Sequence, residues 1–279
     1  MNYDLLQSIT EHDIQDYEKD GVICIRGQFD QEWINNMFAT CMQNDINPGG
    51  NRSEFLDECG PGRFVASSNM SRENNAIMNF VLRSPAAEIA GRLMRLSKVY
   101  FFYDQLFVKE PGTLAPTPWH NDLPFWPLSG ENIASVWVAL TPTPKENSGL
   151  VYVAGSHLWN KMYYPEPATP RPDYVFDEAK GFERCPMFHK EFSNPKYRFL
   201  SWDLDAGDCI VHHPMTVHGS GKNSSLSQNR AAISIRYFGG DATWHGQRTQ
   251  FQVPGTTDDM FKTGTMPAHE TIFPLVWSK

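Results

Sequence analysis

The chain has 279 residues, of which 41% are hydrophobic, 20% charged and 13% aromatic, and its formal net charge is −8. This composition predicts a soluble globular protein with a sizeable core, and the negative charge argues against non-specific nucleic-acid binding, which needs basic contacts to phosphates. No segment approaches the length of an apolar membrane span, and the N-terminus lacks the pattern of a signal peptide. The 5 cysteines are scattered and odd in number, which disfavours a disulfide framework. We expect a cytoplasmic protein.

The first third of the chain is predicted to be mainly helical. Thr10 and Asp30 are candidate N-caps, because their side-chain oxygens can accept hydrogen bonds from the first turn of a helix. A short apolar run bounded by glycines predicts one strand, and a segment rich in Asn, Gly and Ser predicts a long loop. The expected elements are a helix from residue 11, a strand over 21–27, a helix over 30–42, a loop over 45–75 and a helix over 76–96.

From residue 99 onward the chain changes to short β-rich runs separated by Gly, Pro and Asn turns. Several short strands after helices predict an α+β protein, mainly β, with a double-stranded β-helix (jelly roll, cupin-like) core. The expected strands are 99–103, 105–109, 134–140, 150–153, 209–212 and 231–237. We expect a single domain over 1–279, with a helical N-terminal part at about 8–96, the jelly-roll core at about 99–240, a Pro-rich insertion at 160–200 and a C-terminal tail packed on the core.

A Trp-His-Asn-Asp sequence at 119–122 is the first candidate for chemistry. Pro118 favours an extended conformation of the residue before it, so a strand is plausible here. In a strand, His120 and Asp122 point to the same face because side chains alternate with period 2. A second histidine would complete a set of two histidines and one carboxylate, which is typical of non-haem Fe(II) oxygenases. The alternative is a surface strand with a capping aspartate.

The candidate for that second histidine is His218, which lies beside glycines that allow the backbone to bend near a site. His212 and His213 are its rivals, and we interpret them as structural or supporting residues. Arg230, twelve residues after His218, is a candidate carboxylate anchor, because a guanidinium stays charged and pairs with a carboxylate through two hydrogen bonds. Arg236 lies on the same strand face and is the alternative anchor. A surface salt bridge is the competing interpretation for either arginine.

Together, these segments resemble the phytanoyl-CoA dioxygenase family of Fe(II)/2-oxoglutarate oxygenases over roughly residues 8–240. The segments are weak one by one but specific in this order and spacing. They are residues 11–27, Lys109-Glu110-Pro111-Gly112, 119–122, 137–140, 149–157, 206–208, 218–223 and Arg230.

The resemblance implies an enzyme that uses Fe(II), 2-oxoglutarate and O2, and it assigns roles by position. The implied iron ligands are His120, Asp122 and His218; the implied contacts of 2-oxoglutarate are Arg230 with its C5 carboxylate, then Trp137, Gln105 and Thr117; His157 is interpreted as structural. Related halogenases have Gly or Ala where this chain has Asp122. The resemblance therefore implies hydroxylation, or a related oxidation such as desaturation, with release of succinate and CO2.

The substrate is predicted from aromatic residues alone. Trp119, Phe125 and Trp126 flank the metal strand and are candidates to line an apolar pocket, with ordinary sheet packing as the alternative. We expect a small hydrophobic molecule of the secondary-metabolite type, no nucleic acid and no membrane as partners, and a monomer or homodimer. Two other functions are considered: a catalytically silent jelly-roll binding or regulatory protein, and a cupin-type metalloenzyme that does not use 2-oxoglutarate.

Overall fold

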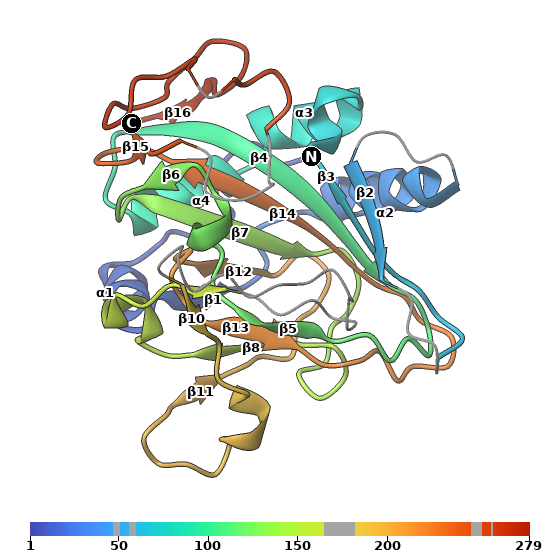
Figure 1. Cartoon of the computed structure of the whole chain (residues 1–279). Coiled ribbons are helices and arrows are strands. Elements are labelled where there is room, and N and C mark those ends of the chain that lie inside the picture. The colour runs from blue at the N-terminus through green and yellow to red at the C-terminus, as the bar shows by residue number, and fades with distance from the viewer. Residues whose placement is uncertain (47–50, 56–59, 165–181, 247–252, 258) are drawn as a thin grey trace.

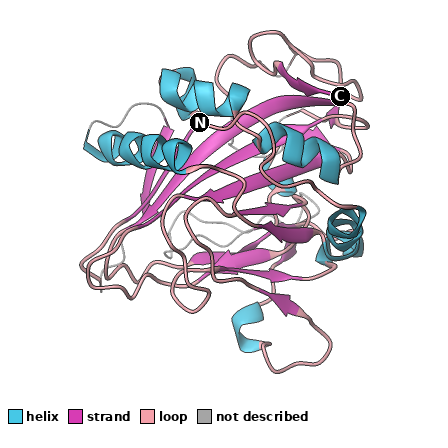
Figure 2. Cartoon of the chain, turned by 180° about the vertical axis from the view of Figure 1, so that it is seen from behind, coloured by secondary structure: helices cyan, strands magenta, loops and turns pink. Residues whose placement is uncertain are grey.

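The computed structural model of the chain describes residues 1–46, 51–55, 60–164, 182–246, 253–257 and 259–279. A large sheet of eight strands and a smaller sheet of four strands face each other, and helices cover the outer face of the large sheet (Figures 1 and 2). This is the predicted jelly-roll core with helical decoration. No helix in the described part of the chain has the length and apolar character needed to span a bilayer.

The large sheet has the strand order β1-β12-β7-β14-β4-β3-β2, with β16 paired to β4 off this path. Its strands are β1 (Val22–Ile25), β2 (Asn51–Phe55), β3 (Phe64–Ser68), β4 (Lys98–Lys109), β7 (Ile133–Ala139), β12 (Cys209–His212), β14 (Arg230–Phe238) and β16 (Leu275–Ser278). Neighbouring strands are antiparallel throughout. Segments from both ends of the chain therefore complete one sheet.

The small sheet has the order β11-β8-β13-β5 and carries two of the candidate site histidines. Its strands are β5 (Thr117–His120), β8 (Leu150–Val153), β11 (Phe199–Leu200) and β13 (His218–Ser220). Two short pairs lie beside the main sheets: β6 (Leu128–Ser129) with β15 (Thr243–Trp244), and β9 (Tyr163–Tyr164) with β10 (Glu183–Arg184).

The first two helices begin where the sequence predicts. They are α1 (Glu11–Asp20), α2 (Gln31–Ile46), α3 (Asn75–Arg83) and α4 (Ala86–Leu93), with 3-10 turns η1 (Met70–Arg72), η2 (Leu123–Phe125), η3 (Ser156–Trp159) and η5 (Phe188–Lys190). Thr10 and Asp13 form a capping box at the start of α1. At the start of α2, the Asp30 carboxylate accepts a hydrogen bond from the Trp33 backbone N–H at 3.0 Å. Both predicted N-caps are confirmed.

Alternation along β14 separates the core from the site. Ile233 and Ile235 face the helices and belong to the largest hydrophobic cluster, whereas Ala232 belongs to a cluster between the two sheets. By the period of 2, Arg230, Ser234 and Arg236 share the inner face with Ala232. The polar residues of β14 are thus directed toward the small sheet, where the candidate histidines lie.

Two predictions for the first third of the chain are wrong. The helix expected over 76–96 is divided into α3 and α4 at Ser84 and Pro85, because proline disfavours a helical residue before it, and Ser84 is extended at ψ 163. The loop expected over 45–75 contains β2, β3 and η1. Its polar residues form strands because β3 pairs with the long strand β4, which supplies the hydrogen bonds that local propensity does not predict.

The segments after the first third agree more closely. The two strands expected on either side of Asp104 are one continuous strand, β4. In the tail, Phe273 is fully buried and β16 joins the end of β4. The insertion at 160–200 contributes β9, β10, η5 and the edge strand β11. Residues 165–181 of that insertion lie outside the described residues.

Candidate metal centre

His120 and His218 are brought together by the register of the small sheet. His218 on β13 lies directly opposite His120 on β5 and Tyr152 on β8. The two histidine rings have centroids 4.3 Å apart. Residues that are directly opposite in antiparallel strands have neighbouring side chains. Strand pairing, more than the flexibility of the adjacent glycines, therefore explains why His218 reaches the site.

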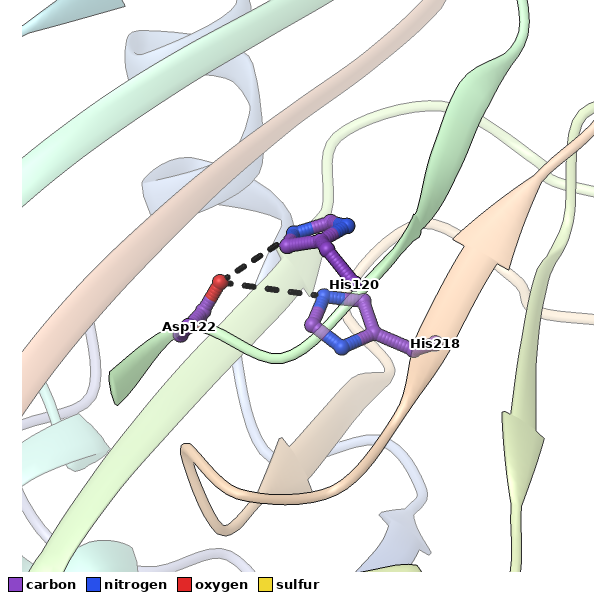
Figure 3. Close-up of side chains that lie close together, drawn as sticks. All are labelled: His120, Asp122 and His218. Carbon is purple, nitrogen blue, oxygen red and sulfur yellow. Dashed lines mark ion pairs between the residues drawn. The ribbon is translucent and has the colours of Figure 1, made fainter. Parts of the chain in front are cut away.

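Asp122 reaches the site by a different route from the one predicted. The strand ends at His120, and Asp122 is in the helical region at φ −77 and ψ −39, so the two do not share a strand face. Asn121 redirects the chain, because its amide binds the Lys161 carbonyl and the Tyr163 N–H at 2.8 and 3.0 Å. The Asp122 N–H donates to the Pro214 carbonyl at 2.7 Å. The turn still brings Asp122 beside the histidines (Figure 3).

The geometry of the three side chains suits a metal ion. One ligand atom from each of His120, Asp122 and His218 lies within 4.8 Å of the others. Asp122 Oδ1 is 3.3 Å from His120 Nε2 and 4.0 Å from His218 Nε2. Their Nδ1 atoms lie 2.7 and 3.0 Å from the Pro118 and Thr216 carbonyls. A carbonyl partner requires Nδ1 to carry the proton, which leaves the Nε2 lone pair for a metal.

Burial and neighbouring charges set the protonation states that ligation requires. Burial favours the neutral form of Asp122, but the interactions with His120 and His212 outweigh it and hold the pKa of the carboxyl well below its ordinary value. Burial, together with the charges of His120 and His212, lowers the pKa of His218 well below its ordinary value. At neutral pH the site therefore presents an ionised carboxylate and a neutral His218 imidazole.

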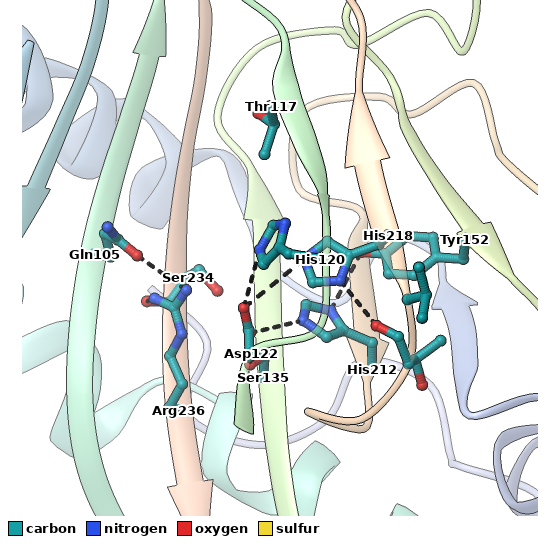
Figure 4. Close-up of polar contacts among 12 residues, drawn as sticks. Gln105, Thr117, His120, Asp122, Ser135, Tyr152, His212, His218, Ser234 and Arg236 are labelled. Atoms are coloured by element: carbon teal, nitrogen blue, oxygen red, sulfur yellow. Dashed lines mark hydrogen bonds and ion pairs between the residues drawn. The ribbon is translucent and has the colours of Figure 1, made fainter. Parts of the chain in front are cut away.

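The rival histidines have other partners. His212 Nε2 lies 3.3 Å from Asp122 Oδ2, to which Ser135 Oγ also donates at 3.3 Å, and the Tyr152 hydroxyl lies 3.2 Å from His212 Nδ1 (Figure 4). His212 thus holds Oδ2 of Asp122, the carboxylate oxygen that is not directed at His120 and His218. His213 binds the Glu131 carbonyl through Nε2 and accepts from the Met215 N–H through Nδ1, so both of its nitrogens are used away from the site.

A pair of buried cations lies at the other end of the inner face of β14. Arg230 donates to Ser148 Oγ at 3.1 Å and to Ser220 Oγ at 3.3 Å. Lys109 Nζ donates to the same Ser220 Oγ at 2.9 Å and to the Gly221 carbonyl at 2.7 Å. Neither cation forms an ion pair with a carboxylate of the described residues. Buried charge without a partner is costly, so this pair favours an anionic ligand.

Burial disfavours the charged form of both side chains and so lowers their pKa values. The pKa of Arg230 falls to about 10. Burial, and then the charge of Arg230, lowers the pKa of Lys109 well below its ordinary value. Lys109 belongs to a segment that resembles the family, but it was not predicted as a site residue. A lysine at the end of an apolar strand was the signal that would have identified it.

The remaining predicted 2-oxoglutarate contacts lie at the two ends of the inner face of β14. One end holds Arg230 and Lys109, and the other, called the metal end here, lies beside the candidate metal ligands. Thr117 Oγ accepts a hydrogen bond from Ser220 Oγ at 2.9 Å, next to the cation pair. The guanidinium of Arg230 lies 5.5 Å from the centre of the Trp137 ring. Gln105 lies elsewhere, because its Oε1 accepts from Arg236 at 3.0 Å near the metal end. A cavity of about 340 Å³ adjoins Arg230 and is lined further by polar residues such as Asn147 and Asn223.

Two of the three predicted substrate contacts pack against hydrophobic clusters instead of facing the site. Trp119 alternates with His120 along β5, so its ring packs on the other face of the small sheet, against Phe188 at 5.6 Å. Trp126 is 1% exposed in a hydrophobic cluster and donates to the Tyr103 hydroxyl at 2.9 Å. Only Phe125 lies beside the site, with its ring centroid 6.3 Å from that of His120. The positions of both tryptophans agree with sheet packing, the alternative interpretation.

His157 lies away from the three candidate ligands. Its Nε2 atom lies 3.1 Å from the Glu18 carbonyl, and its ring centroid lies 5.5 Å from that of His213, with the two planes tilted by 50°. It packs over Gly21, where a Cβ atom would come within 2.3 Å of the His157 ring. This position agrees with a structural role.

Comparison with known proteins gives consistent results. A family model described as phytanoyl-CoA dioxygenase (PhyH) matches residues 17–232. The multifunctional dioxygenase prhA of Penicillium brasilianum is 26% identical over 145 residues, which are 49% of this chain and 40% of that protein. The peroxisomal phytanoyl-CoA dioxygenase of Rattus norvegicus is 30% identical over 129 residues, 46% of this chain and 35% of that protein. The match thus spans less than half the length of these curated relatives.

Solved structures extend the likeness over the whole fold. The non-heme alpha ketoglutarate dependent epimerase SnoN from nogalamycin biosynthesis matches with a TM-score of 0.72 and 22% identity, covering 94% of this chain and 96% of that one. The carbocyclase SnoK from the same biosynthesis matches with a TM-score of 0.70 and 23% identity, covering 99% and 100%. At these identities the likeness establishes the jelly-roll fold.

Proposed function

Because the chain belongs to the phytanoyl-CoA dioxygenase family, we propose that it is an Fe(II)/2-oxoglutarate-dependent oxygenase. The observation that carries this proposal is the convergence of His120, Asp122 and His218, whose ligand atoms lie within 4.8 Å of one another. Two neutral imidazoles and one carboxylate are the donor set of this class of iron site and leave positions for a cosubstrate. The residues of this chain therefore fit the metal.

The cation pair supports a dicarboxylate cosubstrate. Iron at +2, Asp122 at −1 and 2-oxoglutarate at −2 sum to −1, which Arg230 balances. Ser148 and Ser220 hold the guanidinium in place, and Lys109 adds a donor that can take up a proton when an anion binds. A cupin-type enzyme that does not use 2-oxoglutarate has no evident need for these buried cations. When bound, iron with 2-oxoglutarate and O2 supplies the oxidising chemistry, with succinate and CO2 as coproducts.

The residues of the chain have three tasks in this reaction. His120 and His218, held through Nδ1 by backbone carbonyls, present Nε2 in fixed directions, so little reorganisation is needed on metal binding. His212 and Ser135 hold the distal oxygen of Asp122, which fixes the carboxylate orientation. Arg230 and Lys109 orient the cosubstrate by its remote carboxylate. All of these groups except the partly exposed His120 are buried, and a dry site strengthens their interactions.

We further propose that the substrate is a small molecule of the secondary-metabolite type and that the reaction is a hydroxylation or a related oxidation such as desaturation. Two observations support this: Asp122 supplies the carboxylate, and structural relatives are described as enzymes of nogalamycin biosynthesis. The proposed setting is the cytoplasm, with the protein acting as a monomer or homodimer.

The test is a succinate assay with a panel of metabolites. Purified protein with Fe(II), O2 and 2-oxoglutarate is expected to form succinate, and omission of iron or conversion of His218→Ala is expected to abolish it. His157→Ala is a suitable control, because His157 lies outside the three candidate ligands. The absence of succinate with every compound, combined with no binding of 2-oxoglutarate, would contradict the proposal.

A further inference from the structure

Arg236 is a second buried arginine that the proposed mechanism does not use. It is 4% exposed and lies on the inner face of β14, opposite Ser135 on β7 and Tyr103 on β4. The Ser135 hydroxyl donates to Asp122, so Arg236 occupies the row of the sheet that reaches the metal end. Figure 4 shows Arg236 with Gln105 and Ser234 on one side of Asp122.

The guanidinium of Arg236 is only partly satisfied by the protein. It donates to Gln105 Oε1 at 3.0 Å and to the Ser234 carbonyl at 3.1 Å. Its Nε–H and the neighbouring Ser234 hydroxyl have no hydrogen-bond partner among the described residues. Buried polar atoms are paired in the great majority of native proteins, so unpaired ones beside a site need a partner from outside the protein, such as a ligand or an ordered water.

No carboxylate of the described residues forms an ion pair with Arg236. Asp104 is engaged by the Met70 and Ser71 N–H groups and by the Ser71 hydroxyl. Asp122 is engaged by the histidines and is the proposed carboxylate ligand of the metal. Among the residues that the structure describes, the charge of Arg236 therefore has no dedicated counter-ion, although burying a lone guanidinium is costly.

The cosubstrate does not account for Arg236 either. Arg230 and Arg236 are six residues apart on one strand, a backbone separation of about 20 Å. If 2-oxoglutarate spans from the metal to Arg230 and Lys109, its remote carboxylate lies at the far end of β14 from Arg236. The aromatic rings around Arg236 also differ from the hydroxyls around Arg230. The guanidinium lies 4.6 Å from the Tyr103 ring centre and 5.9 Å from that of Phe107.

We propose that Arg236, Gln105 and Ser234 form a subsite for an anionic oxygen of the primary substrate, a carboxylate or an ionised phenol or enol on an apolar body. The inference rests on the proposed function and refines it, because the predicted substrate was hydrophobic only. Arg236 and Ser234 donate to the anionic oxygen, Gln105 holds the guanidinium in position, and the Tyr103 and Phe107 rings supply an apolar wall. Arg236 would thereby orient the substrate toward the metal end.

Benzoate and benzamide are suitable probes, because they have the same shape and differ in charge. Each is titrated by calorimetry into zinc-loaded protein saturated with 2-oxoglutarate, in which zinc prevents turnover. Benzoate is expected to bind about tenfold or more tightly than benzamide, the effect of one charge-assisted contact. Equal affinities, or no saturable binding of benzoate, would overturn the inference.

Substitutions test which side chains cause the preference for benzoate over benzamide. Arg236→Gln and Gln105→Glu are expected to reduce benzoate affinity to that of benzamide, the second because its carboxylate neutralises Arg236 without changing the side-chain shape. Arg236→Lys keeps the charge and is expected to restore part of the preference. Arg198→Gln, at the distant ion pair with Asp20, is the control and is expected to bind both probes like the wild type.

The cosubstrate titration separates the two proposals. The Arg236 and Gln105 variants are expected to bind 2-oxoglutarate as the wild type does, which also shows that they are folded. If Arg236→Gln weakens 2-oxoglutarate as much as benzoate, Arg236 belongs to the cosubstrate site and the inference is wrong. If wild-type protein fails to bind 2-oxoglutarate at all, the proposed function fails; if it binds and the variants leave benzoate affinity unchanged, only the inference fails.

Discussion

The two arginines of β14 lie on one strand and one face, are equally buried at 4% exposure, and yet have different surroundings. Arg230 lies among hydroxyl groups, beside Lys109 and a cavity of about 340 Å³. Arg236 lies between aromatic rings, close to the carboxylate of the candidate metal centre. Neither arginine forms an ion pair with a carboxylate of the described residues, which favours an anionic ligand for each. Their positions relative to the metal end suggest different ones, the cosubstrate at Arg230 and the substrate at Arg236.

Loss of the metal should have the largest effect, both on the proposed cosubstrate site at Arg230 and on the proposed substrate site at Arg236. His218→Ala deletes one of three proposed ligands and is expected to abolish iron binding and succinate formation, because two remaining ligands hold Fe(II) poorly. Metal analysis of the purified protein and the succinate assay measure these effects. Retention of stoichiometric iron by the variant would show that His218 is not a ligand.

The two arginines should differ in their effect on 2-oxoglutarate. Arg230→Gln removes a charge-assisted contact worth about 1.5–3 kcal/mol and is expected to raise the Kd for 2-oxoglutarate about 10- to 100-fold. Arg236→Gln is expected to leave that Kd within about threefold. Calorimetric titration of the zinc-loaded proteins measures both values. An equal loss of 2-oxoglutarate affinity in the two variants would mean that Arg230 and Arg236 do not bind different ligands.

His213 offers a contrast, because it is buried like the arginines but fully hydrogen-bonded within the protein. Burial, followed by the charge of His157, lowers its pKa from 6.5 to about 3. The unfolded chain then binds more protons between these values, so His213 contributes stability above pH 6.5 that is lost as the pH falls toward 3. The loss at about pH 5 is about 2 kcal/mol.

Urea unfolding of wild type and His213→Gln at neutral pH and at about pH 5 tests this value. The glutamine cannot take up a proton, so the variant is expected to lose less unfolding free energy on acidification. The same pH dependence in both proteins would mean that His213 is not kept neutral by burial.

Lys109→Met should have the smallest effect. It should raise the stability of the ligand-free protein but lower its affinity for 2-oxoglutarate. Replacement of a buried amine that forms no ion pair with a described carboxylate is expected to stabilise the ligand-free protein by about 1 kcal/mol. The same change is expected to weaken 2-oxoglutarate binding about tenfold, because one donor to the anion is lost. Urea unfolding and calorimetry measure the two effects. Destabilisation of the ligand-free protein would indicate that Lys109 serves the fold alone.

The sequence predicted the large features well because they depend on local patterns. The predicted N-caps Thr10 and Asp30 are confirmed, and the strands of the core follow their apolar runs. The β2–β3 pair was not predicted, because its polar residues become strands only through pairing with β4. The prediction of one helix over 76–96 did not take into account that Pro85 disfavours a helical conformation at Ser84.

The candidate site was predictable in its residues but not in its geometry. His120 and Asp122 meet through a turn fixed by Asn121, whose partners are 40 or more residues away in sequence, so local periodicity gave the wrong reason for the contact. Trp119 was assigned to the pocket by proximity in sequence, although alternation along the strand directs it away from His120. Lys109 and Arg236 are informative only once it is known that they are buried and form no ion pair with a carboxylate in the described part of the chain.

The most direct test of the proposed cosubstrate site is an anaerobic titration of the iron-loaded protein with 2-oxoglutarate. The titration follows the visible absorption that appears when this ligand coordinates Fe(II). The proposed site predicts a saturable band that requires iron, is absent in His218→Ala, and needs a higher concentration of 2-oxoglutarate in Arg230→Gln. Binding of 2-oxoglutarate with equal affinity in the presence and absence of iron, and without the band, would contradict it.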